Sequence, residues 1–316
     1  MKPTILLTGK TGQLGSELNM LLPKLGEVIA PERKELDLLD PEKIRRVMRD
    51  AKPDLVVNAA AYTAVDAAET DQPNALAINA EAPRLLALEA KNLGAMLVHF
   101  STDYVFDGST RAPYEETDPT NPINVYGKTK LAGEQAVRSS GVPHLIFRAA
   151  WIYSTRGRNF LLTILRLATE REELKIVRDQ IGAPTCAADI AAATAKILTN
   201  IYGRNDNACA IPNVSGTYHM TAAGETTWYD FAKDILDEAY HASQDLSWFA
   251  AATQGRRLLA RRIIPITTAE YGSRTSRPAY SVLSNSRLTQ TFGVTLPDWR
   301  TQLHKCFAIR SYERIS

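Results

Sequence analysis

Short apolar runs alternate with helical patterns through the first half of the chain. The middle of each run is apolar, as in strands that are buried on both faces of a parallel sheet. Between the runs, apolar residues recur every three or four positions, which indicates helices packed against such a sheet. This alternation predicts an α/β fold with a doubly wound parallel sheet and right-handed crossovers. We expect strands at Thr4–Leu7, Glu27–Ala30, Leu36–Leu38, Asp54–Asn58, Ala95–Phe100 and Pro143–Arg148.

After Trp151 the regular alternation stops. Helical patterns continue at Phe160–Thr169, Cys186–Thr199 and Trp228–Ala239, separated by stretches that contain proline and glycine. We therefore predict a dinucleotide-binding domain at residues 1–150 and a smaller, mixed α/β domain at 151–316 that binds mainly the substrate. A return of the chain to the first domain is expected near residues 183–205.

The first predicted strand leads into a glycine-rich turn, Gly9-Lys10-Thr11-Gly12-Gln13-Leu14-Gly15. A strand, a glycine turn and a helix in this order are typical of dinucleotide binding, because the glycines let a pyrophosphate approach the helix N-terminus. The phosphate-binding loop of nucleoside triphosphatases is excluded, since no glycine precedes Gly9 at the required spacing.

Residues after the second predicted strand leave the choice between NAD and NADP open. An acid at this place binds the adenosine ribose and repels a 2′-phosphate, whereas basic side chains attract that phosphate. Glu32 favours NAD, while Arg33 and Lys34 favour NADP. After the strand at Asp54–Asn58, three alanines, Ala59 to Ala61, are small enough to let a cofactor lie close above the strand ends.

Tyr126 and Lys130 are four residues apart in a predicted helix and therefore share one face. We expect the lysine ammonium to lower the tyrosine pKa from its usual value of about 10, which would make the phenol a proton donor. Ser101 and Thr102 end a predicted strand at the sheet edge where ligands bind. A hydroxyl from either residue would hold a substrate oxygen against the phenol. The set predicts reduction of a carbonyl group.

The composition describes an ordinary globular chain of 316 residues, with 45% hydrophobic and 23% charged residues. A formal net charge of +2 and the lack of long basic runs argue against nucleic-acid binding. No apolar stretch has the length of a signal sequence or a membrane span, so we expect a cytoplasmic protein without membrane contact. The three cysteines, Cys186, Cys209 and Cys306, have no paired or metal-ligand spacing and are expected to be free thiols.

Several longer motifs resemble the dTDP-4-dehydrorhamnose reductase family of extended short-chain dehydrogenases/reductases. They are the glycine turn at 9–15 and the stretches 57–66, 101–108, 126–134 and 182–185, with Arg277-Pro278 and 296–300 resembling the family's tail. The resemblance covers nearly the whole chain and implies a Rossmann-type fold. It also implies that NADPH or NADH reduces the C4 ketone of dTDP-4-dehydro-β-L-rhamnose, the last step of dTDP-L-rhamnose biosynthesis.

The resemblance further implies a role for each matching residue. Tyr126 would protonate the new C4 oxygen, Thr102 would hydrogen-bond it, and Lys130 would hold the nicotinamide ribose and tune Tyr126. Asp103 and Trp151 would touch the substrate, as would Tyr126 and Thr102. The cofactor would contact Tyr126 and Lys130 as well as Gly9, Thr11, Gly12, Gln13, Leu14, Asp37, Leu38, Ala59, Ala60 and Ala61.

One departure concerns magnesium, which some family members hold with acidic side chains at a dimer interface. Glu17 is present, but Cys186-Ala187-Ala188 offers no acid before Asp189. We therefore expect neither the metal nor that particular dimer, and we leave a homodimer of another kind open.

Two other functions stay open. Nucleotide-sugar dehydratases, the nearest enzymatic alternative together with epimerases, carry Thr-Asp-Glu where this chain has Thr102-Asp103-Tyr104, and a tyrosine does not replace a carboxylate base at neutral pH. A non-catalytic dinucleotide-binding regulatory subunit is the other alternative. The intact Tyr126 and Lys130 argue against it.

Overall fold

The computed structural model describes residues 2–203, 214–242 and 246–308. Its centre is a six-stranded sheet with the strand order β10-β5-β4-β3-β1-β2. Every neighbouring pair in this sheet is parallel, which confirms the predicted α/β fold class. The strands are β1 (Thr4–Thr8), β2 (Glu27–Ile29), β3 (Leu55–Asn58), β4 (Met96–Thr102), β5 (His144–Ala149) and β10 (Gly216–His219).

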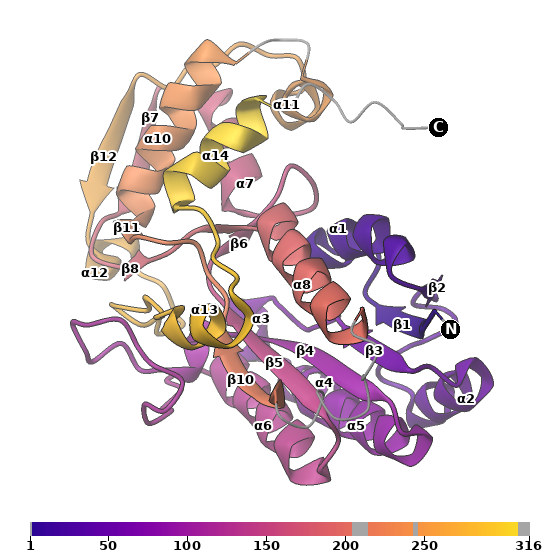
Figure 1. Ribbon diagram of the computed structural model, residues 1–316. Coiled ribbons are helices and arrows are strands. Elements are labelled where there is room, and N and C mark those ends of the chain that lie inside the picture. The colour runs from indigo at the N-terminus through magenta and orange to yellow at the C-terminus, as the bar shows by residue number, and fades with distance from the viewer. Residues whose placement is uncertain (1, 204–213, 243–245, 309–316) are drawn as a thin grey trace.

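Helices cover both faces of the sheet, as Figure 1 shows. One face packs against α1 (Gln13–Leu21) and α8 (Ala187–Tyr202). The other face packs against α2 (Pro41–Ala51), α5 (Ala82–Leu93) and α6 (Val125–Ser140). Shorter helical elements link these layers: η1 (Leu22–Lys24), α3 (Val65–Ala68), α4 (Gln72–Leu76), η2 (Ala77–Glu81) and η3 (Asp103–Val105).

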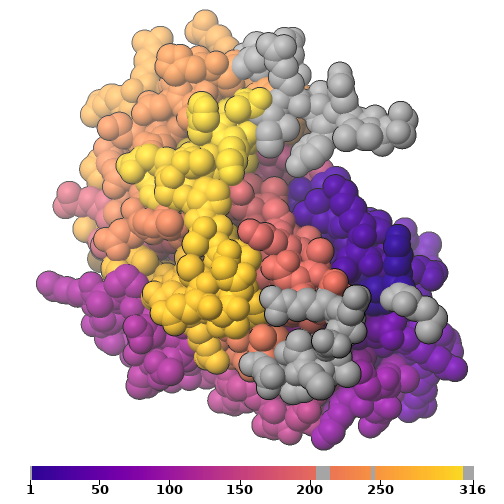
Figure 2. Space-filling model, in the orientation of Figure 1, coloured from indigo at the N-terminus to yellow at the C-terminus, as the bar shows by residue number. Residues whose placement is uncertain are grey.

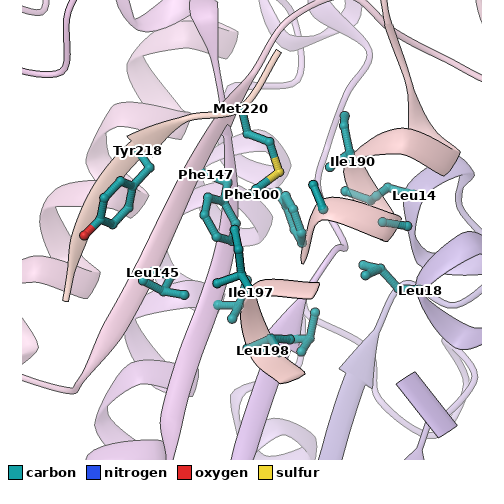
Figure 3. Close-up of a cluster of buried hydrophobic side chains, with 14 of the residues drawn as sticks. Leu14, Leu18, Phe100, Leu145, Phe147, Ile190, Ile197, Leu198, Tyr218 and Met220 are labelled. Atoms are coloured by element: carbon teal, nitrogen blue, oxygen red, sulfur yellow. The ribbon is translucent and has the colours of Figure 1, made fainter. Parts of the chain in front are cut away.

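The face under α1 and α8 holds one of the two large apolar clusters of the described residues (Figure 3). Leu18 of α1, Ile197 of α8 and Phe147 of β5 are all completely buried in this cluster. Each such side chain contributes about 1.5–3 kcal/mol through its removal from water. This apolar packing holds α8, from the second half of the chain, against the first helix.

Local side-chain hydrogen bonds fix the start of α2 and explain why one predicted strand is absent. Asp40 caps α2 by accepting hydrogen bonds from the backbone N–H groups of Glu42 and Lys43, both at 3.1 Å. Residues 36–38 do not form the predicted strand. The side chain of Asp37 accepts the N–H of Leu39 at 3.1 Å, and its carbonyl accepts the N–H of Asp40 at 3.0 Å. These bonds turn the backbone out of an extended conformation.

The sheet gains one strand that the sequence pattern did not predict. Residues 216–219 form β10, which pairs in parallel with β5 at the edge of the sheet. With only four residues, two of them polar, this strand is too short to produce a recognisable pattern.

A second apolar cluster lies among helices of the later part of the chain. It is built mainly by α7 (Phe160–Ala168), α10 (Trp228–His241), α11 (Ser247–Thr253) and α14 (Trp299–Ala308). Beside these helices, β7 (Glu173–Val177) and β12 (Arg262–Ile266) form a parallel pair. The remaining elements are β6 (Ile152–Tyr153), β8 (Ile181–Gly182), β9 (Thr185–Cys186), β11 (Thr226–Thr227), α12 (Thr268–Tyr271) and α13 (Ser286–Phe292).

The segment from α13 to α14 connects the two apolar clusters. Leu288 and Leu296 belong to the cluster on the central sheet, and Trp299 belongs to the second cluster. Figure 2 shows this yellow segment running across the visible surface, from beside the orange atoms of the later part of the chain to the pink atoms of the first half. It also brings Cys306 to Cys186, with the two buried sulfur atoms 3.6 Å apart and no disulfide between them. Cys209, the third cysteine, lies outside the described residues. None of the described helices is long and apolar enough to cross a membrane.

Candidate active site

A cavity of about 740 Å³ opens at the carboxyl ends of β1, β3, β4 and β5. Ligands of doubly wound sheets bind at this edge. Every site residue predicted from the sequence lines this cavity. These are Gly9, Thr11, Gly12, Gln13, Leu14, Asp37, Leu38, Ala59, Ala60, Ala61, Thr102, Asp103, Tyr126, Lys130 and Trp151.

The glycine turn between β1 and α1 is possible only with glycine at two positions. Gly9 has a φ of +72°, and a Cβ there would lie 2.9 Å from the backbone of Ala60. A Cβ on Gly15 would come within 2.0 Å of the Gly9 carbonyl oxygen. The turn closes through a 2.9 Å hydrogen bond from the N–H of Gly12 to that same carbonyl. The start of α1 therefore faces the cavity with its free N–H groups, a site suited to an anion.

Gln13 connects this turn to the later part of the chain. The amide of Asn159 donates a 2.8 Å hydrogen bond to the side-chain oxygen of Gln13. Asn159 also caps α7 by accepting the N–H of Leu162. The glycine turn and α7 are thus held together beside the cavity.

Tyr126 and Thr102 meet at the end of β4. Asn124 caps α6 with a 2.8 Å hydrogen bond from the N–H of Gly127, which places Tyr126 in the first turn of that helix. A hydrogen bond joins the hydroxyl groups of Tyr126 and Thr102. The Thr102 hydroxyl also contacts the Asp103 carboxylate at 3.0 Å. Two hydroxyls therefore converge on one point of the cavity wall.

The expected lowering of the Tyr126 pKa by Lys130 is wrong for this structure. Burial raises the pKa of Tyr126 to about 12, the Thr102 hydrogen bond offsets this in part, and the Asp103 carboxylate raises it further. Lys130 instead donates a 2.6 Å hydrogen bond to the carbonyl oxygen of Phe100. The phenol consequently keeps its proton throughout the neutral pH range.

Lys130 is itself almost completely buried, with 2% of its surface exposed. Burial lowers its pKa to about 8, although the nearby Glu134 carboxylate opposes the change. Glu134 is fully buried and accepts hydrogen bonds from the Arg148 guanidinium at 2.9 and 2.8 Å. Burial alone would raise the pKa of Glu134, but the hydrogen bonds and charge of Arg148 outweigh it and lower the pKa. A charged pair thus supports α6 directly behind the cavity.

Asp103 is a buried acid in the cavity wall. Only 2% of the residue is exposed, and burial raises its pKa to about 6, even though hydrogen bonds from the side chains of Ser281 and Thr102 act to lower it. The residue lines the cavity, and an acid with a pKa raised in this way on a cavity wall is a candidate for contact with a ligand.

At the opposite end of the cavity lie the charged residues that left the choice between NAD and NADP undecided. Each of them is paired with a neighbouring charge. Lys34 lies 3.3 Å from Glu32, and Arg33 lies 4.0 Å from Asp37. The Arg33 side chain is 77% exposed. Exposed pairs of this kind are weak, with a median worth of about 0–1 kcal/mol, so a ligand phosphate can compete for the guanidinium.

Sequence reasoning missed several residues of the cavity wall, and Trp228 is the largest of them. It begins α10 and stacks on Trp151, which was predicted. No local motif marks Trp228, because the contact joins positions far apart in the sequence. Other missed residues include Thr63, Val65, Ile78, Gly157 and Arg158.

The acids considered for magnesium do not fit a metal site within one chain. Glu17 is buried with the Arg156 guanidinium 3.8 Å away, and Asp189 lies 3.5 Å from the Lys305 ammonium. Across the described ranges, no group of three or more His, Cys, Asp or Glu side chains is arranged to hold a metal ion. A magnesium ion requires several oxygen ligands in near-octahedral order.

Comparison with known proteins gives a consistent picture. The family model described as "RmlD substrate binding domain" matches residues 1–311. A dTDP-4-dehydrorhamnose reductase of Burkholderia thailandensis is 50% identical over 302 residues, covering 96% of this chain and 97% of the relative. The enzyme of that name from Escherichia coli K12 is 42% identical, with 94% of each chain covered.

Solved structures agree with the sequence relatives. The crystal structure of dTDP-4-dehydrorhamnose reductase from Bacillus anthracis, in complex with NADP, superposes with a TM-score of 0.85 at 33% identity. The match covers 98% of this chain and 99% of the other. Together with the family model and the relatives above, this shows that the chain belongs to the dTDP-4-dehydrorhamnose reductase family.

Proposed function

We propose that this protein reduces the C4 ketone of dTDP-4-dehydro-β-L-rhamnose to give dTDP-β-L-rhamnose, the last step of dTDP-L-rhamnose biosynthesis. The observation that carries the proposal is the convergence of Tyr126, Thr102 and Lys130 in one cavity at the carboxyl end of β4. Relatives that carry the name of this activity match the chain over almost its whole length.

Tyr126 is the proton donor in this mechanism. When bound, the reduced nicotinamide supplies the hydride for the ketone carbon. The carbonyl oxygen then becomes an alkoxide, which is a far stronger base than a phenolate. A phenol with a pKa of about 12 is protonated before the reaction and still transfers its proton downhill to that oxygen.

Thr102 and Lys130 assist from two sides of the phenol. The Thr102 hydroxyl lies at the same point of the wall and is placed to stabilise negative charge on the ketone oxygen. Lys130 is assigned to the nicotinamide ribose and, once Tyr126 has lost its proton, to stabilising the phenolate. The buried Glu134 carboxylate favours the charged form of this lysine.

The dinucleotide occupies the part of the cavity between the glycine turn and the paired charges at Glu32 and Arg33. The free N–H groups at the start of α1 would bind its pyrophosphate, and Ala59 to Ala61 would lie under its centre. The Bacillus anthracis relative binds NADP. We assign NADPH as a cofactor of this chain and expect NADH to serve as well, because neither Glu32 nor Arg33 acts as an unpaired charge.

The sugar nucleotide occupies the end of the cavity near Asp103 and Trp151. The Asp103 carboxylate, which lines the cavity, would accept a hydrogen bond from a sugar hydroxyl. In this assignment residues 1–150 form the cofactor domain, with a return near 183–205, and residues 151–316 mainly bind the substrate. A cytoplasmic location and a homodimer that needs no magnesium complete the proposal.

The alternatives have less support. Tyr104 stands where a dehydratase has its carboxylate base, and burial, with the neighbouring Asp103 carboxylate, raises its pKa well above the usual value. It cannot remove a proton from a sugar at neutral pH. A regulatory subunit without activity would have no need for the Tyr126, Thr102 and Lys130 arrangement.

A direct assay tests the proposal. Purified protein is mixed with dTDP-4-dehydro-β-L-rhamnose and NADPH, and loss of the reduced nicotinamide is followed by absorbance. We expect turnover that depends on the keto-sugar. Cofactor binding without turnover, under conditions in which a known reductase is active, would favour the regulatory alternative.

A further inference from the structure

The indole ring of Trp151 is held on both faces. The ring of Trp228 stacks on it with the centroids 3.5 Å apart and the planes inclined by 6°. Gly182 lies against the ring as well, since a Cβ at Gly182 would come within 2.4 Å of Cε2 and 2.7 Å of Cζ2 of Trp151. A parallel stack at this distance leaves no room for another group between the rings. Gly182 therefore covers the opposite face.

The backbone of Trp151 is strained in this position. Its φ is +45°, in the left-handed region that residues with a Cβ rarely adopt. Such a conformation persists only when the surroundings enforce it, and it is common at ligand sites. The ring stack is unusual too, because aromatic pairs generally prefer offset or edge-to-face arrangements with centroids about 4.5–7 Å apart.

Contacts with Gln180 and Phe160 hold Trp228 in the position that enforces this arrangement. Its Nε1–H donates a 3.2 Å hydrogen bond to the side-chain oxygen of Gln180, and the amide of Gln180 donates in turn to Thr268 at 3.1 Å. The ring of Phe160 packs against it with the centroids 4.5 Å apart. Trp228 is thus fixed from the second apolar cluster, while Trp151 follows β5 of the central sheet.

We propose that Trp228 is a positioning residue for the nucleotide-sugar substrate, which acts by clamping Trp151 against Gly182. With both faces covered, Trp151 offers the cavity only the edge of its ring. Its Nε1–H has no acceptor among the described residues and is not enclosed by protein, so it is available to donate to a sugar oxygen. The sugar is then recognised by a hydrogen bond at the indole edge and not by stacking on the indole face. This inference rests on the proposed function.

The test compares Trp228→Leu, Trp228→Phe and the control Trp248→Phe, which changes a tryptophan outside the cavity. We expect Trp228→Leu to raise KM for the keto-sugar roughly tenfold, with KM for NADPH unchanged. A tenfold change in affinity corresponds to the loss of about one hydrogen bond. Trp228→Phe should give a smaller rise, because it keeps a ring beside Phe160, and it serves as the working variant should the leucine variant not fold.

A spectroscopic readout tests the clamp independently of activity. Two indoles stacked this closely couple electronically and give a paired positive and negative band in far-ultraviolet circular dichroism. The band should disappear in both Trp228 variants and remain in Trp248→Phe. An unchanged spectrum in Trp228→Leu would show that the rings are not stacked and overturn the proposal.

The kinetic outcomes separate this inference from the function on which it rests. If the wild-type protein fails to reduce the keto-sugar, the proposed function itself is contradicted. If the wild type is active and Trp228→Leu keeps its KM for the sugar, only the clamp is overturned. An equal rise of both KM values would mean that Trp228 supports the fold in general, and it would also overturn the proposal.

Discussion

Replacing Asp103 by asparagine should stabilise the protein at neutral pH while impairing turnover. The carboxylate is held ionised in a buried site, where its pKa is raised from 3.8 to about 6. Each tenfold change in proton affinity corresponds to about 1.36 kcal/mol, so the ionised form costs the folded protein at most about 3 kcal/mol at pH 7. Asparagine has nearly the same shape and carries no charge to desolvate.

The sign of the effect follows from proton binding. Between the unfolded pKa near 3.8 and the folded pKa near 6, the folded state binds more protons than the unfolded state, so stability falls as pH rises through this window. The free-energy cost of burying the ionised carboxylate is absent below this pH window and fully present above it. The advantage of Asp103→Asn should therefore be at most about 3 kcal/mol at pH 7 and shrink to roughly half of that at pH 5.

Melting temperatures at the two pH values provide the assay. One kcal/mol moves the melting temperature of a large domain by about 2–4 °C, so the predicted difference is measurable. Asp107→Asn is the matched control with the opposite sign, because hydrogen bonds, first of all from Asn121, hold the pKa of Asp107 well below its usual value. An Asp103→Asn protein that is less stable than wild type, or a difference that does not change with pH, would refute the reasoning.

Four further predictions concern the cofactor and the catalytic groups. Tyr126→Phe should bind NADPH normally and lose about 10²–10⁴-fold in kcat, because only the phenolic proton is removed; near-normal kcat would exclude Tyr126 as the donor. Lys130 has a pKa of about 8, so kcat/KM should fall as pH rises through that value and the ammonium is lost, and Lys130→Met should weaken both NADPH binding and rate. NADPH and NADH should differ by less than about tenfold in kcat/KM, and Arg33→Ala should shift the preference toward NADH, as steady-state kinetics would show. Excess EDTA should change neither turnover nor melting temperature, and a loss that magnesium restores would reveal a metal site.

The parts of the site that could be predicted from sequence are those carried by local motifs. The glycine turn and the residues at the ends of β3 and β4 are positioned by their own strands, so a correct strand prediction also places them at the cavity. The cap that Asp40 forms on α2 is of the same local kind, because capping depends only on neighbouring backbone groups.

The parts that could not be predicted depend on contacts between distant segments. β10 forms because β5 offers it an edge, and Trp228 reaches the cavity because α10 starts beside Trp151. The pKa of Tyr126 was misjudged for a related reason. A shared helix face places Lys130 near the phenol, but the carbonyl of Phe100 determines where the ammonium points. Burial determines the pKa of the phenol. Neither effect can be read from the spacing of the two residues.

The central claim is hydride transfer to C4 of the sugar with protonation of the resulting alkoxide oxygen by Tyr126. The most direct measurement uses NADPH that carries deuterium at both C4 hydrogens of the nicotinamide, with dTDP-4-dehydro-β-L-rhamnose as substrate and nuclear magnetic resonance of the sugar product. We predict dTDP-β-L-rhamnose with one deuterium at sugar C4, formed by the wild type and only at a greatly reduced rate by Tyr126→Phe. Oxidation of the cofactor with no deuterium at that carbon, or equal rates for the two proteins, would contradict the account.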